Sequence, residues 1–403
     1  MENKLKVAYA QINFQPSYVG INGYQMDEPT TFTSDGAKTL SSLPSTNEVR
    51  NLKSHMRKYN LSNLKVKIES ILDYCSSKQV NLVVFPEYSV PVQLIEMCYE
   101  YSKQNEIIII AGSHSVVNSQ ESNGIYEKCQ LFKKGKLGGL DSLEDSVRKA
   151  VCPIFTPNGE NYIVQKITQS KWEGEMVVDD RWETITVNYP GVSVRIAVLL
   201  CIDALSEEKK HILYENGLQD ADLIIIPSYS PSTTPFENVA LLNLLNEKPT
   251  VYCNVAEYGG SRIYANHGSS SADLFLVNNG TIETGKQETV VGVELNLSGQ
   301  FQKKGSSKTY VPVRSLFCAP VVYCSNNTVF DSYSSELNGI LLSWSLEKAK
   351  NLIERYLVIS GSHLPDLMRT NLSRARDMVE EGRATSREVL LLYRSRYYQK
   401  GFP

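Results

Sequence analysis

Three residues carry the side chains of a base, a cation and a nucleophile, and each of them closes an apolar run. Glu87 ends NLVVFPE, Lys166 ends NYIVQK and Cys201 ends VRIAVLLC. A thiol becomes nucleophilic when a base takes its proton, and an ammonium stabilises the negative charge that develops on an attacked carbonyl. Alone, a strand cysteine is usually a core residue and a lysine a surface residue. Their joint placement predicts acyl transfer at a thiol.

This chemistry requires the three strand ends to converge, and an internal repeat indicates how they do so. The segment NLVVFPEYS at 81–89 recurs as DLIIIPSYS at 222–230, each a buried strand that ends in proline. In both copies a helical spacer precedes a second apolar strand, EIIIIAGSHSV from Glu106 and PTVYCNVAEYG from Pro249. The chain therefore contains two related strand–helix–strand units.

A third pair of strands is expected after Tyr126 and after Ser271, each running into a Gly turn of the hairpin kind. Two such halves bury their apolar runs best as two sheets packed face to face with helices outside. The runs LVVF, IIII, AVLL and LIII are too continuous for strands with one wet face. The sequence therefore predicts an α/β fold, a four-layer αββα sandwich, in preference to a single doubly wound sheet.

Two segments fall outside the repeat. Residues 15–60 are polar and rich in Gly, Ser, Thr and Pro, which predicts an insertion before a helix resumes near Leu61, either a lid over the site or a surface loop. From residue 299 the repeat stops. We expect one domain over 1–298 and a mostly helical C-terminal extension over 299–403, with helical runs near 334–358, 364–381 and 385–398.

Composition excludes several classes of protein. The 403 residues are 42% hydrophobic and 21% charged, as in ordinary globular proteins. The 41 Lys and Arg nearly balance the 44 Asp and Glu, so a dedicated nucleic-acid binder is not expected. No apolar run approaches the roughly 20 residues of a membrane helix, and MENKLKVAYAQINF has no apolar leader. We expect a cytoplasmic protein without a membrane partner.

Cysteine and histidine spacing gives no sign of a disulfide framework or a metal site. The eight cysteines form no Cys-x-x-Cys pair, and the five histidines show no zinc-ligand spacing. We therefore expect catalysis without a metal or another cofactor.

The ordered motifs resemble those of the nitrilase, or carbon–nitrogen hydrolase, superfamily over residues 5–298. The family's apolar strand with Pro-Glu is similar to LVVFPEY at Glu87, and its lysine strand is similar to YIVQK at Lys166. Its apolar strand with Cys-x-Asp is similar to VLLCID at Cys201. The segments ADLIIIPS and YCNVAEYG and a later Gly-x-Ser step resemble further landmarks of the family.

The resemblance implies an αββα sandwich and a Glu-Lys-Cys triad. Glu87 would take the proton of Cys201, whose thiolate attacks an amide or nitrile carbon to give a thioester. Lys166 and the backbone N–H of Ile202 would stabilise the developing negative charge. Water activated by Glu87 would then hydrolyse the thioester.

Further site residues are predicted around this triad. The family often uses a second glutamate after the lysine, and Glu173 or Glu175 would fill that role, with Glu175 favoured. Tyr88, Tyr229 and Tyr258 lie close to predicted strand ends and are candidates to line a substrate pocket; core or surface packing is the alternative for each.

The expected function is that of a thiol amidase, a carbon–nitrogen hydrolase that cleaves a non-peptide amide and releases ammonia or an amine. Amide hydrolysis is favoured over nitrile hydrolysis. Two alternatives remain: an acyltransferase that uses the same thioester, and a binding or assembly subunit with little catalysis whose C-terminal helices contact a protein partner. The expected partners are a small amide or nitrile and further copies of the chain in a homodimer or larger homo-oligomer.

Overall fold

The computed structural model describes the chain over the ranges 4–14, 47–112, 114–115, 119–131, 149–170, 178, 181–189, 192–246, 248–256, 258–266, 274–278, 288–297, 301–304, 307–310 and 314–321. Residues 4–14 and the described residues from 68 onward belong to one compact unit, and residues 47–67 belong to a second. All the strands and all the contacts of the site described below lie in the first unit.

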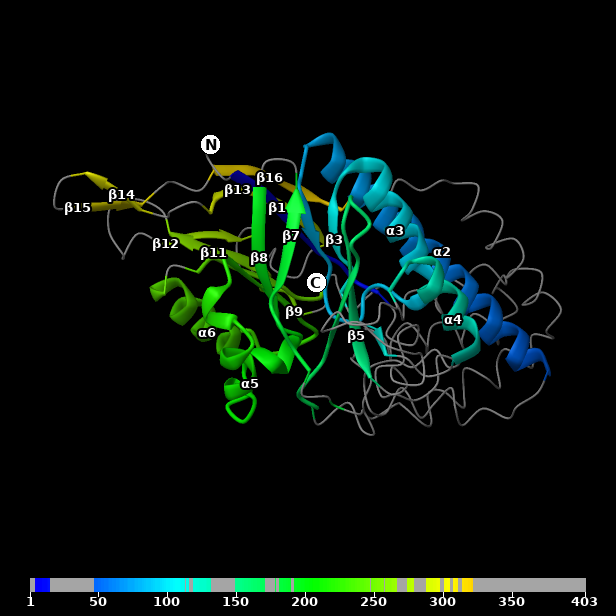
Figure 1. Ribbon diagram of the computed structural model, residues 1–403. Coiled ribbons are helices and arrows are strands. Elements are labelled where there is room, and N and C mark those ends of the chain that lie inside the picture. Colours follow the sequence, from blue (N-terminus) through cyan, green and yellow to red (C-terminus); the bar gives the residue numbers. More distant parts are fainter. Residues whose placement is uncertain are drawn as a thin grey trace, which may run out of the picture. The chain divides into compact units, whose positions relative to one another are not determined.

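An eight-stranded mixed sheet forms one half of the first unit (Figure 1). Its order is β16-β13-β1-β2-β3-β5-β4, with β6 paired to β5. The strands are β1 (Lys4–Gln11), β2 (Leu82–Val84), β3 (Ile108–Ile110), β4 (His114–Ser115), β5 (Ala150–Phe155), β6 (Tyr162–Gln165), β13 (Thr289–Asn296) and β16 (Arg314–Pro320). Strand β1 is parallel to β2 and antiparallel to β13.

A six-stranded sheet forms the other half, in the order β12-β11-β10-β9-β8-β7. Its strands are β7 (Ile185–Tyr189), β8 (Val192–Val198), β9 (Leu223–Pro227), β10 (Thr250–Cys253), β11 (Arg262–Asn266) and β12 (Leu274–Asn278). Strands β8, β9 and β10 run parallel to one another. A separate two-stranded hairpin consists of β14 (Phe301–Lys304) and β15 (Ser307–Tyr310).

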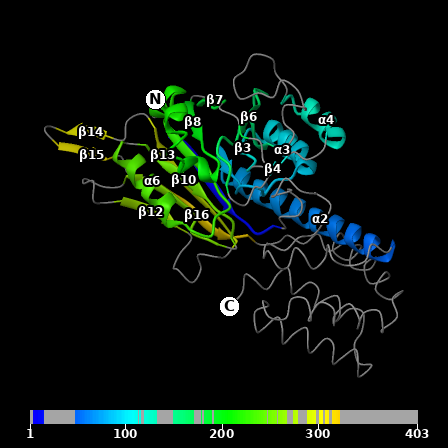
Figure 2. The same cartoon turned by 90° about the horizontal axis from the view of Figure 1, so that it is seen from below.

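Each sheet has a helix packed against two of its neighbouring strands. The helices are α2 (Asn47–Ser77), α3 (Val92–Asn105), α4 (Ser119–Lys128), α5 (Lys210–Glu215) and α6 (Thr234–Leu245), with the 3₁₀ turns η3 (Cys201–Ala204) and η4 (Leu218–Asp220). Helix α3 contacts β3 and β5, and α6 contacts β10 and β11 (Figures 1 and 2). Among the described residues, no helix combines the length and apolar content that crossing a bilayer requires.

The two sheets share one apolar core. Val7 and Val84 of the large sheet belong to the same buried cluster as Ile196 and Ile225 of the smaller sheet. Hydrogen bonds also join the sheets: for example, the Tyr9 hydroxyl donates to the Ser261 carbonyl at 3.0 Å, and the Cys253 thiol donates to the Val84 carbonyl at 3.4 Å. The prediction of a two-sheet α/β fold with strands buried on both faces is confirmed.

The internal repeat is visible in the fold, with one correction. In the first copy β2 and β3 are parallel neighbours joined through α3, and in the second β9 and β10 are parallel neighbours joined through α6. The strand expected after Ser271 is β12, but Tyr126 lies in helix α4 and not in a strand. Tyr126 and Cys129 are both buried at a spacing of one helical turn, so the local period is that of a helix.

Helix α2 begins at Asn47, within the segment predicted as an insertion up to residue 60. From residue 47 to Leu61 the sequence contains no Gly or Pro and several strong helix formers, so propensity outweighs its polar composition. Residues 15–46 lie outside the described part of the chain.

The C-terminal extension begins with strands. Strands β14, β15 and β16 occupy positions within 301–320, and β16 adds to the large sheet by pairing with β13. The predicted helical runs at 334–358, 364–381 and 385–398 lie outside the described residues. The boundary between 298 and 299 stays a prediction.

Gly112 connects the fold to the site, because it packs against the segment that carries Glu87. Its φ is +62°, and a Cβ there would lie 2.1 Å from the Pro86 carbonyl oxygen. Gly112→Ala is therefore expected to lower the free energy of unfolding in urea by about 2–4 kcal/mol, from left-handed strain and overpacking.

Gly124 in α4 is the matched control, because a Cβ there would meet no heavy atom within 4 Å apart from its chain neighbours and the backbone of its own helix. Gly124→Ala is expected to raise the free energy of unfolding by about 0.5–1 kcal/mol. Equal effects of the two substitutions would contradict this account of Gly112.

Candidate active site

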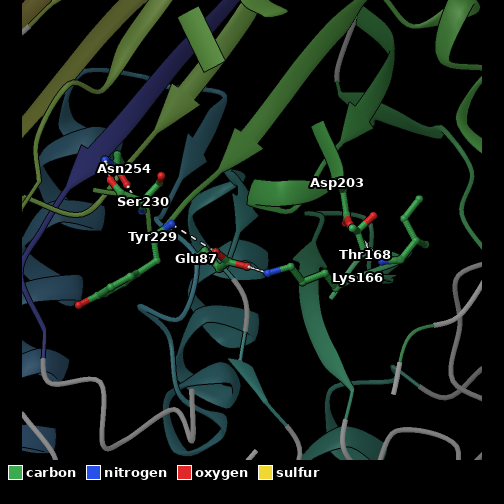
Figure 3. A network of polar contacts seen from close by, with 8 residues as sticks. Glu87, Lys166, Thr168, Asp203, Tyr229, Ser230 and Asn254 are labelled. Carbon is green, nitrogen blue, oxygen red and sulfur yellow. Dashed lines mark hydrogen bonds and ion pairs between the residues drawn. The ribbon is translucent and has the colours of Figure 1, made fainter. Parts of the chain in front are cut away.

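A buried ion pair joins Glu87, which follows β2, to Lys166, which follows β6. The Lys166 ammonium donates to Glu87 Oε1 at 2.6 Å (Figure 3), and the Lys166 and Glu87 side chains are only 1% and 2% exposed, respectively. Removing two charges from water is costly, and a short, hydrogen-bonded pairing compensates much of that cost. Each group therefore depends on the other for its place in the core.

Both residues sit where a strand leaves its sheet. Beyond β2, the Phe85 N–H still donates to the Ile110 carbonyl, but Pro86 has no N–H to continue the ladder. Beyond β6, the Lys166 N–H donates to the Ala150 carbonyl of β5 at 2.9 Å, which fixes the direction of its side chain. The two strand ends thus place Glu87 and Lys166 in contact from positions far apart in sequence.

The second carboxylate oxygen of Glu87 is also held. Glu87 Oε2 accepts a hydrogen bond from the Tyr229 backbone N–H at 3.2 Å, so both oxygens act as acceptors (Figure 3). The Lys166 ammonium lies 5.8 Å from the centre of the Tyr88 ring, within cation–π range.

Cys201 opens the turn η3 in a strained backbone conformation. It has φ +49°, and Tyr88 has φ +62°. Among the described residues, the other non-glycine positions with positive φ are Gln79, Glu106 and Gln130, each just beyond the end of a helix, where this conformation is common. Cys201 and Tyr88 have no such explanation, and strain of this kind gathers at functional sites.

Asp203 ties the cysteine turn to the lysine strand. This fully buried carboxylate, two residues after Cys201, accepts hydrogen bonds from the Thr168 N–H at 2.8 Å and the Ile167 N–H at 3.2 Å (Figure 3). Burial raises the pKa of the Asp203 carboxyl to about 7, against the opposing effects of Lys166 and the Ile167 N–H. The Asp203 side chain thus links the turn that begins at Cys201 to the segment that follows Lys166.

Asn254, which follows β10, fixes the opposite flank of the site. Its side-chain amide donates to the carbonyls of Ser230 and Gly259 at 2.9 and 2.8 Å, and its oxygen accepts from the Ser230 N–H at 3.0 Å. Because Ser230 adjoins Tyr229, this amide fixes the loop whose N–H binds Glu87.

The structure joins four of the predicted site residues by direct contacts: Glu87, Lys166, Tyr88 and Tyr229. Cys201 and Ile202 share the turn that Asp203 ties to Ile167 and Thr168. Glu173 and Glu175 lie outside the described residues. The catalytic roles assigned to these residues remain predictions.

Two positioning residues, Asp203 and Asn254, were not singled out from the sequence. Asp203 stands in the Cys-x-Asp step, and Asn254 directly follows a buried strand in YCNVAEYG. A small polar residue just after a buried strand is the available signal, since such side chains commonly bind loop backbone groups. Sequence spacing does not reveal which backbone groups such a side chain binds or which way it points.

Metal-ligating side chains do not gather in the part of the chain that the structure describes. No group of three or more His, Cys, Asp or Glu residues there could hold a metal ion.

Solved structures similar to this chain include members of the nitrilase superfamily. Nit3 of Saccharomyces cerevisiae, of branch 10 of that superfamily, is 15% identical with a TM-score of 0.41, over 73% of this chain and 90% of Nit3. A carbon–nitrogen hydrolase of Helicobacter pylori G27 is 12% identical with a TM-score of 0.39, over 73% and 90% of the two chains. An amidase of Nesterenkonia sp. is 12% identical with a TM-score of 0.36, over 82% and 97%.

No family model matches the chain, and no curated protein matches its sequence. The likeness to the solved structures concerns the fold alone, so the chemistry of the site rests on this chain's own residues.

Because Glu87 and Lys166 form a buried ion pair, we expect the effects of substituting them on the free energy of unfolding to be strongly non-additive. Glu87→Gln or Lys166→Met alone leaves one uncompensated buried charge and is expected to lower the free energy of unfolding by about 3–5 kcal/mol. The double substitution is expected to cost much less than the sum, as measured by urea unfolding of all four proteins.

The surface pair Glu207 and Lys210 is the matched control, because its N–O distance is also 2.6 Å while its side chains are 79% and 50% exposed. Glu207→Gln and Lys210→Met are expected to change stability little and additively. Additive behaviour of the buried pair would contradict mutual dependence.

The raised pKa of Asp203 leads us to expect that the stability of the protein depends on pH. Its pKa in the folded protein, about 7, lies above the usual value near 3.8, so between these pH values the folded state binds a proton that the unfolded state lacks. The free energy of unfolding therefore falls as pH rises through this window. Relative to Asp203→Asn, the wild type is expected to lose up to about 4 kcal/mol across it.

Urea unfolding of both proteins across the same pH window provides the measurement. Asp220→Asn, at an exposed carboxylate, serves as the control and is expected to show a much flatter difference from the wild type. A flat difference for Asp203→Asn as well would refute the assignment.

Proposed function

We propose that the chain is a carbon–nitrogen hydrolase of the nitrilase superfamily with an αββα sandwich fold. Its reaction is the cleavage of a non-peptide amide through a thioester on Cys201, with release of ammonia or an amine. The observation that carries the proposal is the 2.6 Å Glu87–Lys166 pair, linked through Asp203 to the turn that begins at Cys201.

In the first half of the reaction, Glu87 accepts the proton of the Cys201 thiol. The thiolate attacks the amide carbonyl carbon, and the Lys166 ammonium and the Ile202 N–H stabilise the resulting oxyanion. Glu87 then returns the proton to the leaving nitrogen as the C–N bond breaks. The products are a Cys201 thioester and a free amine.

In the second half, Glu87 accepts a proton from water, and the hydroxide attacks the thioester carbon. The same two donors stabilise the second oxyanion. The S–C bond breaks, the acid leaves and the proton returns to the Cys201 sulfur. We assign the second glutamate of the family to Glu175, with Glu173 as the neighbouring candidate.

The contrast with the other thiols supports the choice of Cys201. Burial raises the pKa of Cys75 and Cys129 to about 12, and it raises the pKa of Cys98, Cys152 and Cys253 well above the usual value of a thiol. Such thiols are inert in apolar surroundings. Cys201, 9% exposed in a strained turn, differs from these five in exposure and in backbone.

Alkylation by iodoacetamide tests this proposal without a known substrate. Peptide mass spectrometry of the native protein is expected to show Cys201 reacting at least about 100-fold faster than the five buried cysteines, because burial raises the pKa of those five thiols, whereas Glu87 serves as the base of Cys201 in the proposed reaction. Glu87→Gln is expected to slow Cys201 and to alter its pH profile.

Glu207→Gln, at an exposed carboxylate, controls for a nonspecific charge effect and is expected to leave the rate and the profile unchanged. A Cys201 that reacts no faster than the buried cysteines would overturn the proposal.

A further inference from the structure

Three aromatic rings from three separate loops meet beside Glu87. Phe14 follows β1, Tyr229 follows β9 and Tyr258 follows β10. The ring of Tyr229 is central: its centroid lies 5.7 Å from that of Phe14 and 5.6 Å from that of Tyr258, both in edge-to-face geometry. All three side chains are only partly buried. We call Phe14, Tyr229 and Tyr258 the aromatic cluster.

The aromatic cluster is continuous with the proposed active site. The backbone N–H of Tyr229 binds Glu87 Oε2, while Figure 3 shows the Tyr229 ring on the side of Glu87 away from Lys166. Tyr229, the central residue of the cluster, therefore lies on the side of the base opposite to the cation.

Hydrogen bonds to the backbone hold the three loops in place. Asn254 binds Ser230, the residue that follows Tyr229 (Figure 3). It also binds Gly259, the residue that follows Tyr258. The Ala256 N–H donates to the Ile12 carbonyl at 3.0 Å, which joins the loop of Tyr258 to the segment that leads to Phe14. The backbones of the three loops are thus tied to one another close to the three rings.

The polar groups of Glu87 and Asn254 beside the cluster are already engaged. Both oxygens of Glu87 accept hydrogen bonds, and the Asn254 amide makes three. This flank presents the faces and edges of three rings, which favour apolar contacts and aromatic packing, together with the hydroxyl groups of two tyrosines.

We propose that Phe14, Tyr229 and Tyr258 bind an apolar, ring-sized substituent of the amide substrate. The inference rests on the proposed function, since it places this substituent beside the amide that Cys201 attacks. It selects amides that carry an aromatic or similarly bulky apolar group over small amides and over amides with a charged substituent.

Protection of Cys201 from iodoacetamide tests the inference independently of turnover. The competitors are acetamide, benzamide, N-benzylacetamide and succinamic acid, the last with a charged group. Benzamide or N-benzylacetamide is expected to protect at a concentration at least about tenfold lower than acetamide or succinamic acid. The better of the two assigns the substituent to the acyl or to the amine side.

Substitutions in the aromatic cluster test whether it causes the preference for ring-bearing amides. Phe14→Leu and Tyr258→Leu, made separately so that one misfolded protein does not decide the outcome, are each expected to reduce the ratio of benzamide to acetamide protection severalfold. Tyr214→Leu, at an exposed tyrosine of helix α5, is the control and is expected to leave the ratio unchanged.

Two results would overturn the inference: ring-bearing amides that protect no better than acetamide, or a preference that both cluster variants retain. The alkylation rate of Cys201 without competitor tests the proposed function separately. A reactive Cys201 without ring preference rejects the aromatic cluster alone, and an unreactive Cys201 rejects the proposed function.

Discussion

The contact between Glu87 and Lys166 is the constraint on which the rest of the site depends. Two opposite charges with almost no access to water are stable only at short range and with their remaining hydrogen-bonding capacity used. Lys166 occupies one carboxylate oxygen of Glu87, and the Tyr229 N–H occupies the other. Strand β2, strand β6 and the loop after β9 must therefore all reach their final positions before the pair can form.

The internal repeat explains why these particular loops meet. The segments 86–89 and 227–230 are equivalent in the two copies, and each follows a parallel strand of its own sheet. The hydrogen bond from Tyr229 to Glu87 therefore links corresponding loops across the two halves. A duplicated strand–helix–strand unit thus places a base from one half against a backbone donor from the other, while Asp203 and Asn254 fix the flanks.

Much of the fold could be predicted because the buried strands are continuous apolar runs, such as those before Glu87 and before Cys201. The strand ends pointed to Glu87 and Lys166 as neighbours, and the structure brings them into contact. Two predictions of local structure were wrong. Helix α2 starts at Asn47, within a polar stretch that was predicted as an insertion, and Tyr126 lies in a helix where a strand was predicted. The roles of Asp203 and Asn254 depend on loop backbone groups far away in sequence, which neither periodicity nor spacing reveals.

The position of β1 limits when the large sheet can fold during synthesis. This first strand lies between β2 and β13, and its antiparallel register with β13 runs from Lys4 opposite Asn296 to Gln11 opposite Thr289. During synthesis the edge of β1 therefore stays open until the ribosome has passed residue 296, long after Glu87, Lys166 and Cys201 have been made. Contacts of such sequence separation form late and slowly. The large sheet can close only after β13 has been made, and until then the nascent chain presents an unpaired strand edge, the kind of surface that chaperones protect.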